Sequence, residues 1–224
     1  MALRIATRRQ VQSHERHGSG YATHVRTTST SMKMETEIAK DSIIIRGEHF
    51  VPYISEMRIQ HRVKEIASGV DARVGTSRPV AVCALSGAVI FYADLLRAME
   101  TDCDMAFIKI SSYGNKKITS EQVKLEVDFT HDLTGRDVII VEDIVDTGIS
   151  IEYLRQRLEE KQVKSVTVVA LLSKPEARKV DSIIDFVGFE IENEFVVGYG
   201  LDYAQEARAL RDIYIRETER STTP

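Results

Sequence analysis

The stretch 138-VIIVEDIVDTGIS-150 decides the fold of this chain. Its first four residues are apolar and predict a buried strand, and three carboxylates follow closely, at Glu142, Asp143 and Asp146. Residues 147–150 then form a turn that leads toward a helix. Like charges crowded in this way repel one another unless they bind something. The stretch therefore predicts a ligand site at the end of a strand.

Apolar runs of this kind recur along the chain from Ile43 onward and alternate with helical stripes. The predicted strands are residues 42–46, 78–85, 105–111, 137–142, 165–173, 183–189 and 194–200. The predicted helices carry apolar stripes over residues 54–70, 89–99 and 151–158. The central strands are apolar without alternation, which is typical of strands buried on both faces. We expect an α/β fold with a mostly parallel central sheet flanked by helices.

Length and composition narrow the class of protein. The 224 residues are 43% hydrophobic and 29% charged, which suits one sizeable domain or two small ones. No apolar run approaches the roughly 18 residues of a membrane helix, and the net charge of −4 argues against nucleic acid as a partner. Cys83 and Cys103 form no CxxC pair, so we expect free thiols and a cytoplasmic protein.

The two ends of the chain differ from its middle. Residues 1–33 hold six basic residues against one acidic residue, are rich in Ser and Thr, and predict a disordered extension. A transit peptide, an expression artefact, or a translated upstream stretch with the start at Met32 or Met34 all fit this composition. We expect the folded domain over residues 40–216 and a flexible tail over residues 217–224.

The opening stretch has the chemistry of a site for a phosphorylated sugar. In an open parallel sheet, ligands bind beyond the carboxyl ends of the strands, where Glu142 and Asp143 emerge. The turn from Asp146 to Ser150 offers unpaired N–H groups at a helix start, and Gly148 lets the backbone close around an anion. The turn suits a phosphate group, and the carboxylates suit a polyol or a metal ion.

Three other protein families contain sequences similar to part of the stretch 138–150. A receiver-domain strand, the DTG triplet of aspartic proteases and a Walker B strand all resemble part of the stretch. The receiver places its phosphate-accepting Asp after a later strand, the protease needs a second Asp in an all-β fold, and the Walker B strand needs a GxxxxGK[ST] loop that this chain lacks. A plain acidic loop in which Asp146 caps a helix also stays open.

The stretch resembles the phosphoribosyl-pyrophosphate (PRPP) signature of type I phosphoribosyltransferases. Four further stretches resemble, in order and spacing, the hypoxanthine-guanine branch of that family: 85-LSGAVIFYADLL-96, 111-SSYGN-115, 171-LLSKPEARK-179 and 185-DFVGFEIENEFVVGYGLDYAQEARALRDIY-214. The resemblance covers about residues 40 to 216. The VGYGLDY segment, at its distance from Lys174, points to 6-oxopurines. A type I phosphoribosyltransferase fold with a small hood region is implied.

The resemblance also implies roles within the opening stretch. Glu142 and Asp143 would hold the ribose hydroxyls of PRPP, in part through Mg²⁺ and water. Asp146 would take the proton from N7 of a purine as the base replaces pyrophosphate at the ribose C1. A carboxylate also suits the positive charge that builds on the ribose. The 5′-phosphate would bind the turn made by Asp146, Thr147, Gly148, Ile149 and Ser150.

Residues farther along the chain would complete the implied site. Lys174 would donate to the purine O6, which hypoxanthine and guanine share and adenine lacks. Phe195 would stack on the base while the backbone of Val196 reads its edge. Asp202 would bind a second Mg²⁺ that bridges the pyrophosphate, because Mg²⁺ favours phosphate oxygens with one or two carboxylates. The guanidinium of Arg208 would contact the pyrophosphate.

Two loops would close the other side of the site. Ser86 and Gly87 lie in the implied pyrophosphate loop, where the family commonly has a basic or polar residue at the position of Ser86. The family often has a cis peptide there, which would be the bond between Leu85 and Ser86. Ser112 and Tyr113 begin a polar stretch that resembles the family's lid, which would exclude water from the reaction.

The implied reaction is purine salvage. The enzyme would transfer the phosphoribosyl group of PRPP to N9 of hypoxanthine, and also to N9 of guanine. Mg²⁺ would be the cofactor, and pyrophosphate would be released. We expect a homodimer or a homotetramer. A xanthine-preferring member and a PRPP-sensing regulator on the same fold stay open as alternatives, since contacts at purine C2 are not readable from one sequence. Asp146 and Lys174 favour the enzyme over the regulator.

Overall fold

The computed structural model describes residues 42–113, 122–129 and 132–217. Every described residue belongs to the compact unit Ala39–Pro224. The predictions for residues 1–33 and for residues 218–224 of the tail lie outside the described ranges. Glu217, the first residue of the predicted tail, donates its N–H to the carbonyl of His49 at 2.9 Å. Among the described helices, none has the length and apolar character needed to cross a membrane.

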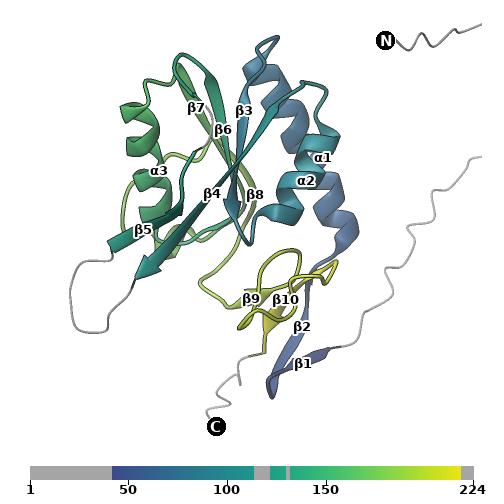
Figure 1. Ribbon diagram of the computed structural model, residues 1–224. Coiled ribbons are helices and arrows are strands. Elements are labelled where there is room, and N and C mark those ends of the chain that lie inside the picture. Colours follow the sequence, from purple (N-terminus) through teal and green to yellow (C-terminus); the bar gives the residue numbers. More distant parts are fainter. Residues whose placement is uncertain (1–41, 114–121, 130–131, 218–224) are drawn as a thin grey trace, which may run out of the picture. The chain divides into compact units, whose positions relative to one another are not determined.

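A six-stranded sheet forms the centre of the domain, in the order β5-β4-β3-β6-β7-β8 (Figure 1). Its strands are β3 (Val80–Leu85), β4 (Asp104–Tyr113), β5 (Gln122–Val127), β6 (Asp137–Val145), β7 (Ser165–Ser173) and β8 (Phe186–Glu190). All neighbours are parallel except β5, which pairs with β4 in antiparallel register. The mostly parallel sheet expected from the sequence is confirmed.

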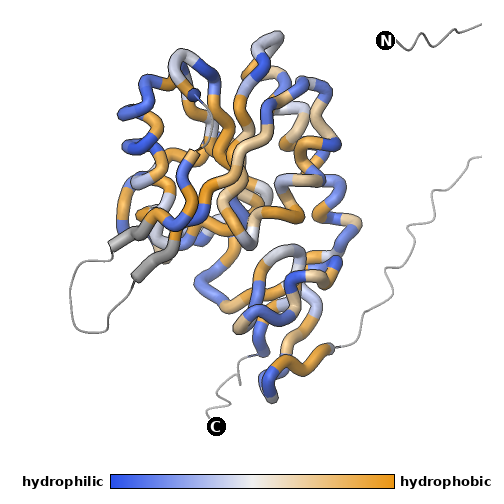
Figure 2. Tube along the Cα trace, viewed as in Figure 1, coloured by the Kyte–Doolittle hydropathy of each residue, from blue (hydrophilic) through white to orange (hydrophobic). Residues whose placement is uncertain are grey.

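Helices cover both faces of this sheet. Helices α1 (Glu56–Val74) and α2 (Val89–Ala98) pack on one face, and α3 (Ile149–Glu160) packs on the other (Figure 1). Successive residues of β6 point to opposite faces, so Ile139 joins the core under α1 and α2 while Ile140 joins the core under α3. Both cores need apolar residues, which explains why β6 shows no polar alternation (Figure 2).

A second, small sheet forms the hood region. Its order is β1-β2-β10-β9, and all neighbours are antiparallel. The strands are β1 (Ile43–Ile45), β2 (Glu48–Ile54), β9 (Val196–Val197) and β10 (Ile213–Arg216). The hood thus joins the first described residues to the last ones, and it lies beside the carboxyl ends of the central strands (Figure 1).

Two hood strands correct the sequence analysis. It did not predict β2 or β10, and it placed Ile54 and Met57 on the buried stripe of a helix. Ile54 instead ends β2, and Met57 is 63% exposed. The helix starts only after Ser55, whose hydroxyl accepts from the N–H of Arg58, while the carboxylate of Asp212 accepts from the N–H of Glu56. The second cap comes from the far end of the chain, so the local pattern could not reveal this start.

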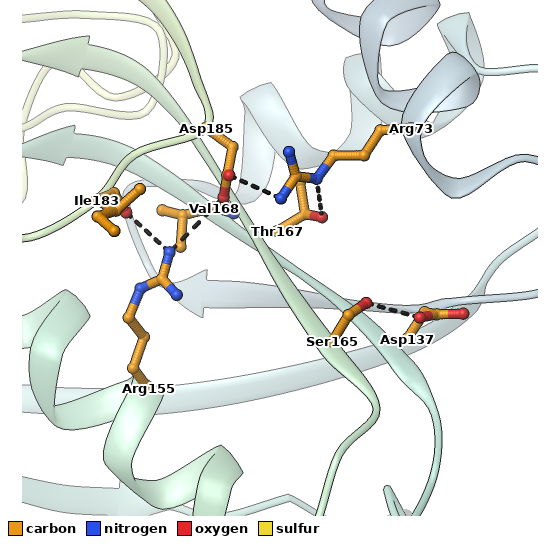
Figure 3. Close-up of polar contacts among 8 residues, drawn as sticks. All are labelled: Arg73, Asp137, Arg155, Ser165, Thr167, Val168, Ile183 and Asp185. Atoms are coloured by element: carbon orange, nitrogen blue, oxygen red, sulfur yellow. Dashed lines mark hydrogen bonds and ion pairs between the residues drawn. The ribbon is translucent and has the colours of Figure 1, made fainter.

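A buried carboxylate links the two helical layers at the amino-terminal side of the sheet (Figure 3). Asp185 accepts from the N–H of Val168 at 2.7 Å and pairs with Arg73 of α1 at 2.9 Å. The guanidinium of Arg155, on α3, lies 3.6 Å from the same carboxylate and donates to the carbonyl of Ile183. Only 11% of the Asp185 side chain is exposed, so each of these bonds lies in a poorly solvated site.

Replacing this carboxylate should destabilise the fold. We expect Asp185→Ala to lower the free energy of unfolding by about 2–3 kcal/mol, because Val168 N–H and two guanidinium groups lose their partner. Urea denaturation measures the change. Asp102→Ala is the matched control: its carboxylate is 82% exposed beside Arg78, and it should cost less than about 0.5 kcal/mol. Equal losses for the two variants would contradict the prediction.

Candidate active site

Strand β6 carries the carboxylate of Glu142 to a cavity at the carboxyl end of the sheet. The strand runs to Val145, three residues past its predicted end, so Asp143 as well as Glu142 lies within it. The cavity has a volume of about 230 Å³ and is lined by Glu142 and by residues of the turn that follows, including Asp146 and Gly148. Asp143 is not among the lining residues and lies against Gly87 instead. Glu142 and the predicted phosphate turn therefore share one cavity.

The acid pair is held in an unusual electrostatic state. Burial raises the pKa of Glu142 well above its usual range, and the neighbouring Asp143 raises it further. Burial likewise raises the pKa of Asp143 to about 6, although backbone N–H groups and the nearby Arg208 partly oppose this. Among the described residues, Glu142 Oε2 is buried and has no hydrogen-bond partner. A ribose hydroxyl or a divalent cation would satisfy that oxygen.

The phosphate turn is built around a glycine. Gly148 is the N-cap of α3, has φ +82°, and leaves no room for a β-carbon because Ser182 and Val180 lie against it. The carbonyl of Thr147 accepts from the N–H groups of Lys179 and Val180, at 3.0 and 3.3 Å, which fixes the turn from behind. The hydroxyl of Thr147, rather than Asp146, accepts from the first N–H of α3, that of Ile149, at 3.4 Å. The alternative in which Asp146 caps the helix is therefore wrong.

The helix that follows the turn supplies the donors. Ile149, Ser150 and the next residues of α3 form its first turn, whose N–H groups have no partner within the helix. The helix dipole adds partial positive charge at the same end. The arrangement suits an anion that has the size of a phosphate group.

Two further predicted residues meet at the mouth of the cavity. Lys174 follows β7 and is only 8% exposed, and its Nζ lies 3.9 Å from Asp146 Oδ2. Its backbone N–H donates to the carbonyl of Val145 at 2.9 Å, so β6 fixes the position of the lysine. Arg178 extends this support by donating to the hydroxyl of Ser173 at 2.9 Å. The sequence analysis gave Arg178 no role, although it lies in the LLSKPEARK stretch.

The residues predicted for stacking and edge reading lie in the hood. Val196 is in β9, and Phe195 packs edge-on against Tyr203 with ring centroids 5.5 Å apart. The guanidinium of Arg216 lies 5.4 Å from the Phe195 ring centroid. Phe195 thus packs with the hood core.

The predicted pyrophosphate loop is pressed between β6 and the hood. The peptide bond between Leu85 and Ser86 is cis, as the resemblance implied. A β-carbon on Gly87 would collide with the carboxylate of Asp143, and a β-carbon on Gly200 would collide with the carbonyl of Gly87. Glycine is required at both positions because backbone and acid approach so closely.

The two remaining predicted residues pair with each other. Arg208 Nη2 lies 2.7 Å from Asp202 Oδ1, and Arg208 also donates to the carbonyl of Gly200 at 2.7 Å. The other oxygen of Asp202 accepts from the N–H of Gln205. Within the described ranges, no three His, Cys, Asp or Glu groups are close enough together to form a metal site. The charge of Asp202 nevertheless raises the pKa of Asp143, so Asp202 lies near the acid pair without forming such a group with it.

The predicted lid starts at the end of β4. The backbones of Ser112 and Tyr113 pair with Val123 and Gln122 of β5, so the flanks of the polar stretch form an antiparallel hairpin. Residues 114–121, between the two strands, lie outside the described ranges. Lid closure therefore stays a prediction.

The acidic strand end, the glycine turn and the hood together define a class of enzyme. Residues 54–204 match the phosphoribosyl transferase domain family, so the chain is a phosphoribosyltransferase. The hypoxanthine-guanine phosphoribosyltransferase of Bacillus subtilis is 43% identical over 157 residues, which are 70% of this chain and 87% of that protein. The corresponding protein of Aquifex aeolicus is 38% identical over 174 residues, which are 77% of this chain and 98% of that protein.

A solved structure agrees with these relatives. The hypoxanthine-guanine phosphoribosyltransferase of Bacillus anthracis superposes with a TM-score of 0.71 at 40% identity, covering 73% of this chain and 96% of that chain. The chain belongs to the hypoxanthine-guanine phosphoribosyltransferase family.

The raised pKa of Asp143 predicts a pH-dependent stability. Its ordinary value is 3.8 and its folded value is about 6. As pH rises through this window the unfolded chain releases its proton first, so stability contributed by this group falls. Relative to the wild type, Asp143→Asn should gain about 2 kcal/mol of unfolding free energy between about pH 4 and pH 7.5. Urea denaturation without divalent metal measures the gain.

The control for this measurement is Asp102→Asn, which alters a carboxylate that is 82% exposed. Its stability relative to the wild type should stay constant across the same pH window. A constant difference for Asp143→Asn as well would show that the buried carboxyl titrates normally.

Proposed function

We propose that this protein transfers the 5-phosphoribosyl group of PRPP to N9 of hypoxanthine and of guanine, and releases pyrophosphate, in purine salvage. The observation that carries the proposal is the pairing of Asp146 with Lys174 beside the glycine turn, 3.9 Å apart at the mouth of one cavity. One group suits a proton that leaves the base, and the other suits an oxygen on the base. The family of the chain supports the same reaction.

The phosphate turn would hold the 5′-phosphate. The donors are the first N–H groups of α3 and the hydroxyls of Thr147 and Ser150. Gly148 has no side chain to fill the space, and the segment around Lys179 and Val180 keeps the turn from opening. This end of the site fixes the ribose, so that its C1 stays close to the base.

The purine would bind between the core and the hood. Lys174 would donate to O6, and Asp146 would accept the proton at N7 as the bond from N9 to the ribose forms. The 3.9 Å ion pair between them has to loosen as a base enters, which frees both groups for it. Phe195 and the backbone of Val196 would come from the hood, so their contact with the base requires the hood to close upon it.

The residues of the acid pair fit a Mg²⁺ ion. Glu142 Oε2 is buried without a partner, and burial together with the charge of Asp143 raises the pKa of Glu142, which a divalent cation would lower. Mg²⁺ takes one or two carboxylates together with phosphate oxygens and water. When bound, the ion would neutralise charge on the pyrophosphate. Glu142 and Asp143 would hold it through the ribose hydroxyls and water.

Pyrophosphate would leave through the opposite side of the site. Ser86 and Gly87 offer backbone N–H groups, and Arg208 offers a guanidinium. Asp202, which pairs with Arg208 at 2.7 Å, would release it to hold a second Mg²⁺ at the pyrophosphate. Ser112 and Tyr113 would bring the lid over this side once both substrates are bound.

Further features of the protein belong to the same proposal. We expect the folded domain to span residues 40–216 and to work without residues 1–33. A homodimer or homotetramer is expected from the family, and a cytoplasmic location fits the two free cysteines.

A purine panel tests the reaction. Hypoxanthine and guanine should form nucleotide with PRPP and Mg²⁺, and adenine should not react because it lacks O6. The rate with xanthine decides between this proposal and a xanthine-preferring enzyme. Nucleotide formation is followed by absorbance for each base. Turnover of adenine would contradict the role of Lys174, and the absence of turnover with every base would favour a PRPP-sensing regulator.

The second experiment tests the proton acceptor. Asp146→Asn should lower turnover by roughly 10²–10⁴-fold, since the amide no longer accepts the proton, while PRPP affinity changes much less. Asp181→Asn is the matched control, because Asp181 is exposed and adjoins Ser182 behind the same turn. Steady-state rates and PRPP binding by calorimetry measure the two effects. Near-normal turnover of folded Asp146→Asn would rule out the role.

A further inference from the structure

A strained turn in the hood lies close to the pyrophosphate loop. Gly198, Tyr199 and Gly200 have φ values of +98°, +50° and +102°. Tyrosine carries a β-carbon, so the left-handed conformation is costly for it. Two backbone hydrogen bonds hold the turn in place. The N–H of Tyr199 donates to the carbonyl of Leu210 at 2.8 Å, and the N–H of Gly200 donates to the carbonyl of Arg208 at 2.9 Å. Surrounding contacts thus impose this backbone on a residue that does not favour it.

The side chain of Tyr199 accounts for its presence in this turn. The ring is buried, with 3% exposed, and its hydroxyl donates to Asp94 Oδ2 at 2.7 Å. Gln60 donates to the same oxygen, also at 2.7 Å. Asp94 lies on α2 and Gln60 on α1. A single carboxylate oxygen therefore joins the hood to both helices on one face of the central sheet.

Both ends of this link lead to the pyrophosphate side of the site. Helix α2, which carries Asp94, begins at Val89, directly after the loop that holds Gly87. In the hood, Gly200 rests against the carbonyl of Gly87, and its own carbonyl accepts from Arg208. The link therefore connects the predicted pyrophosphate ligands of the loop, Ser86 and Gly87, with those of the hood, Asp202 and Arg208. In contrast, Lys174 and Asp146 are fixed by β6 and β7 and lie outside it.

We propose that Tyr199, Asp94 and Gln60 are positioning residues that set the spacing between the Ser86–Gly87 loop and the hood groups Asp202 and Arg208. The proposal rests on the proposed function, since it assigns those groups to pyrophosphate. Pyrophosphate is gripped from the core and from the hood at once, so its binding depends on how the two are spaced. The purine is less sensitive, because its polar partners Lys174 and Asp146 are set within the core and only Phe195 and Val196 reach it from the hood.

Two tyrosine variants separate positioning from general stability. Tyr199→Phe keeps the ring and removes only the hydroxyl bond to Asp94. Tyr92→Phe is the matched control. Tyr92 lies on α2 and, like Tyr199, is buried, with 1% exposed. Its hydroxyl donates to the carbonyl of Ala81 at 3.0 Å. Both variants lose one buried hydrogen bond, so both should melt a few degrees lower.

The kinetic readout should differ between them. We expect Tyr199→Phe to raise the KM for PRPP and the inhibition constant for pyrophosphate by about three- to ten-fold, the effect of one lost hydrogen bond. The KM for hypoxanthine should change less than about two-fold in both variants. Asp94→Ala should match Tyr199→Phe, and the double variant should add little to either, because both changes break the same link.

Hydrogen exchange gives a readout that does not depend on turnover. In Tyr199→Phe without ligand, peptides that contain Ser86–Gly87 and residues 198–202 should exchange faster than in Tyr92→Phe. The positioning role would be overturned if Tyr199→Phe and Tyr92→Phe exchanged at the same rate and also changed the KM for PRPP and the KM for hypoxanthine by the same factor. This holds even if the wild type turns over normally. If the wild type transferred no phosphoribosyl group, the proposed function would fail, and the exchange comparison would still decide whether Tyr199 fixes the loop.

Discussion

The structure depends on the burial of two adjacent carboxylates in the middle of a sheet. Glu142 and Asp143 lie on β6, between β3 and β7, where water does not stabilise their charge. Burial raises the pKa of both groups, and Asp143 raises the pKa of Glu142 further, so the folded chain holds these protons more tightly than the unfolded chain does. A fold retains such a pair at a free-energy cost when a ligand relieves it. The ligand proposed here, a ribose with Mg²⁺, relieves it with hydroxyl donors and positive charge.

The same crowding explains the glycines around the site. Gly87, Gly148 and Gly200 each lie where a β-carbon would collide with a carboxylate, a hydroxyl or a carbonyl group. Backbones from β3, β6 and the hood can therefore approach the acids closely and present N–H groups rather than side chains. Amides fixed in this way bind anions without reorganising. The site is rigid where phosphate binds, and it joins a separate small sheet only where base and pyrophosphate bind.

Much of the core and of the site was predictable because local patterns report them. The apolar run of β6 can be recognised as a strand without knowing which strands pair with it. The order of acids and glycine at its end indicates a site for a phosphorylated sugar. Sequence reasoning placed Lys174 through its resemblance alone, and the structure sets it beside Asp146. It missed β10 and the true start of α1, because the cap from Asp212 lies far along the chain.

The sequence by itself determined the parallel sheet, the acid pair and the phosphate turn, since each is set by residues that are neighbours in the chain. Tertiary structure alone decided which distant groups meet there. Tyr199 reaches Asp94, more than 100 residues away. It also packed Phe195 edge-on against Tyr203 in the hood. Such contacts depend on how the hood packs on α1 and α2, and no local periodicity encodes that packing.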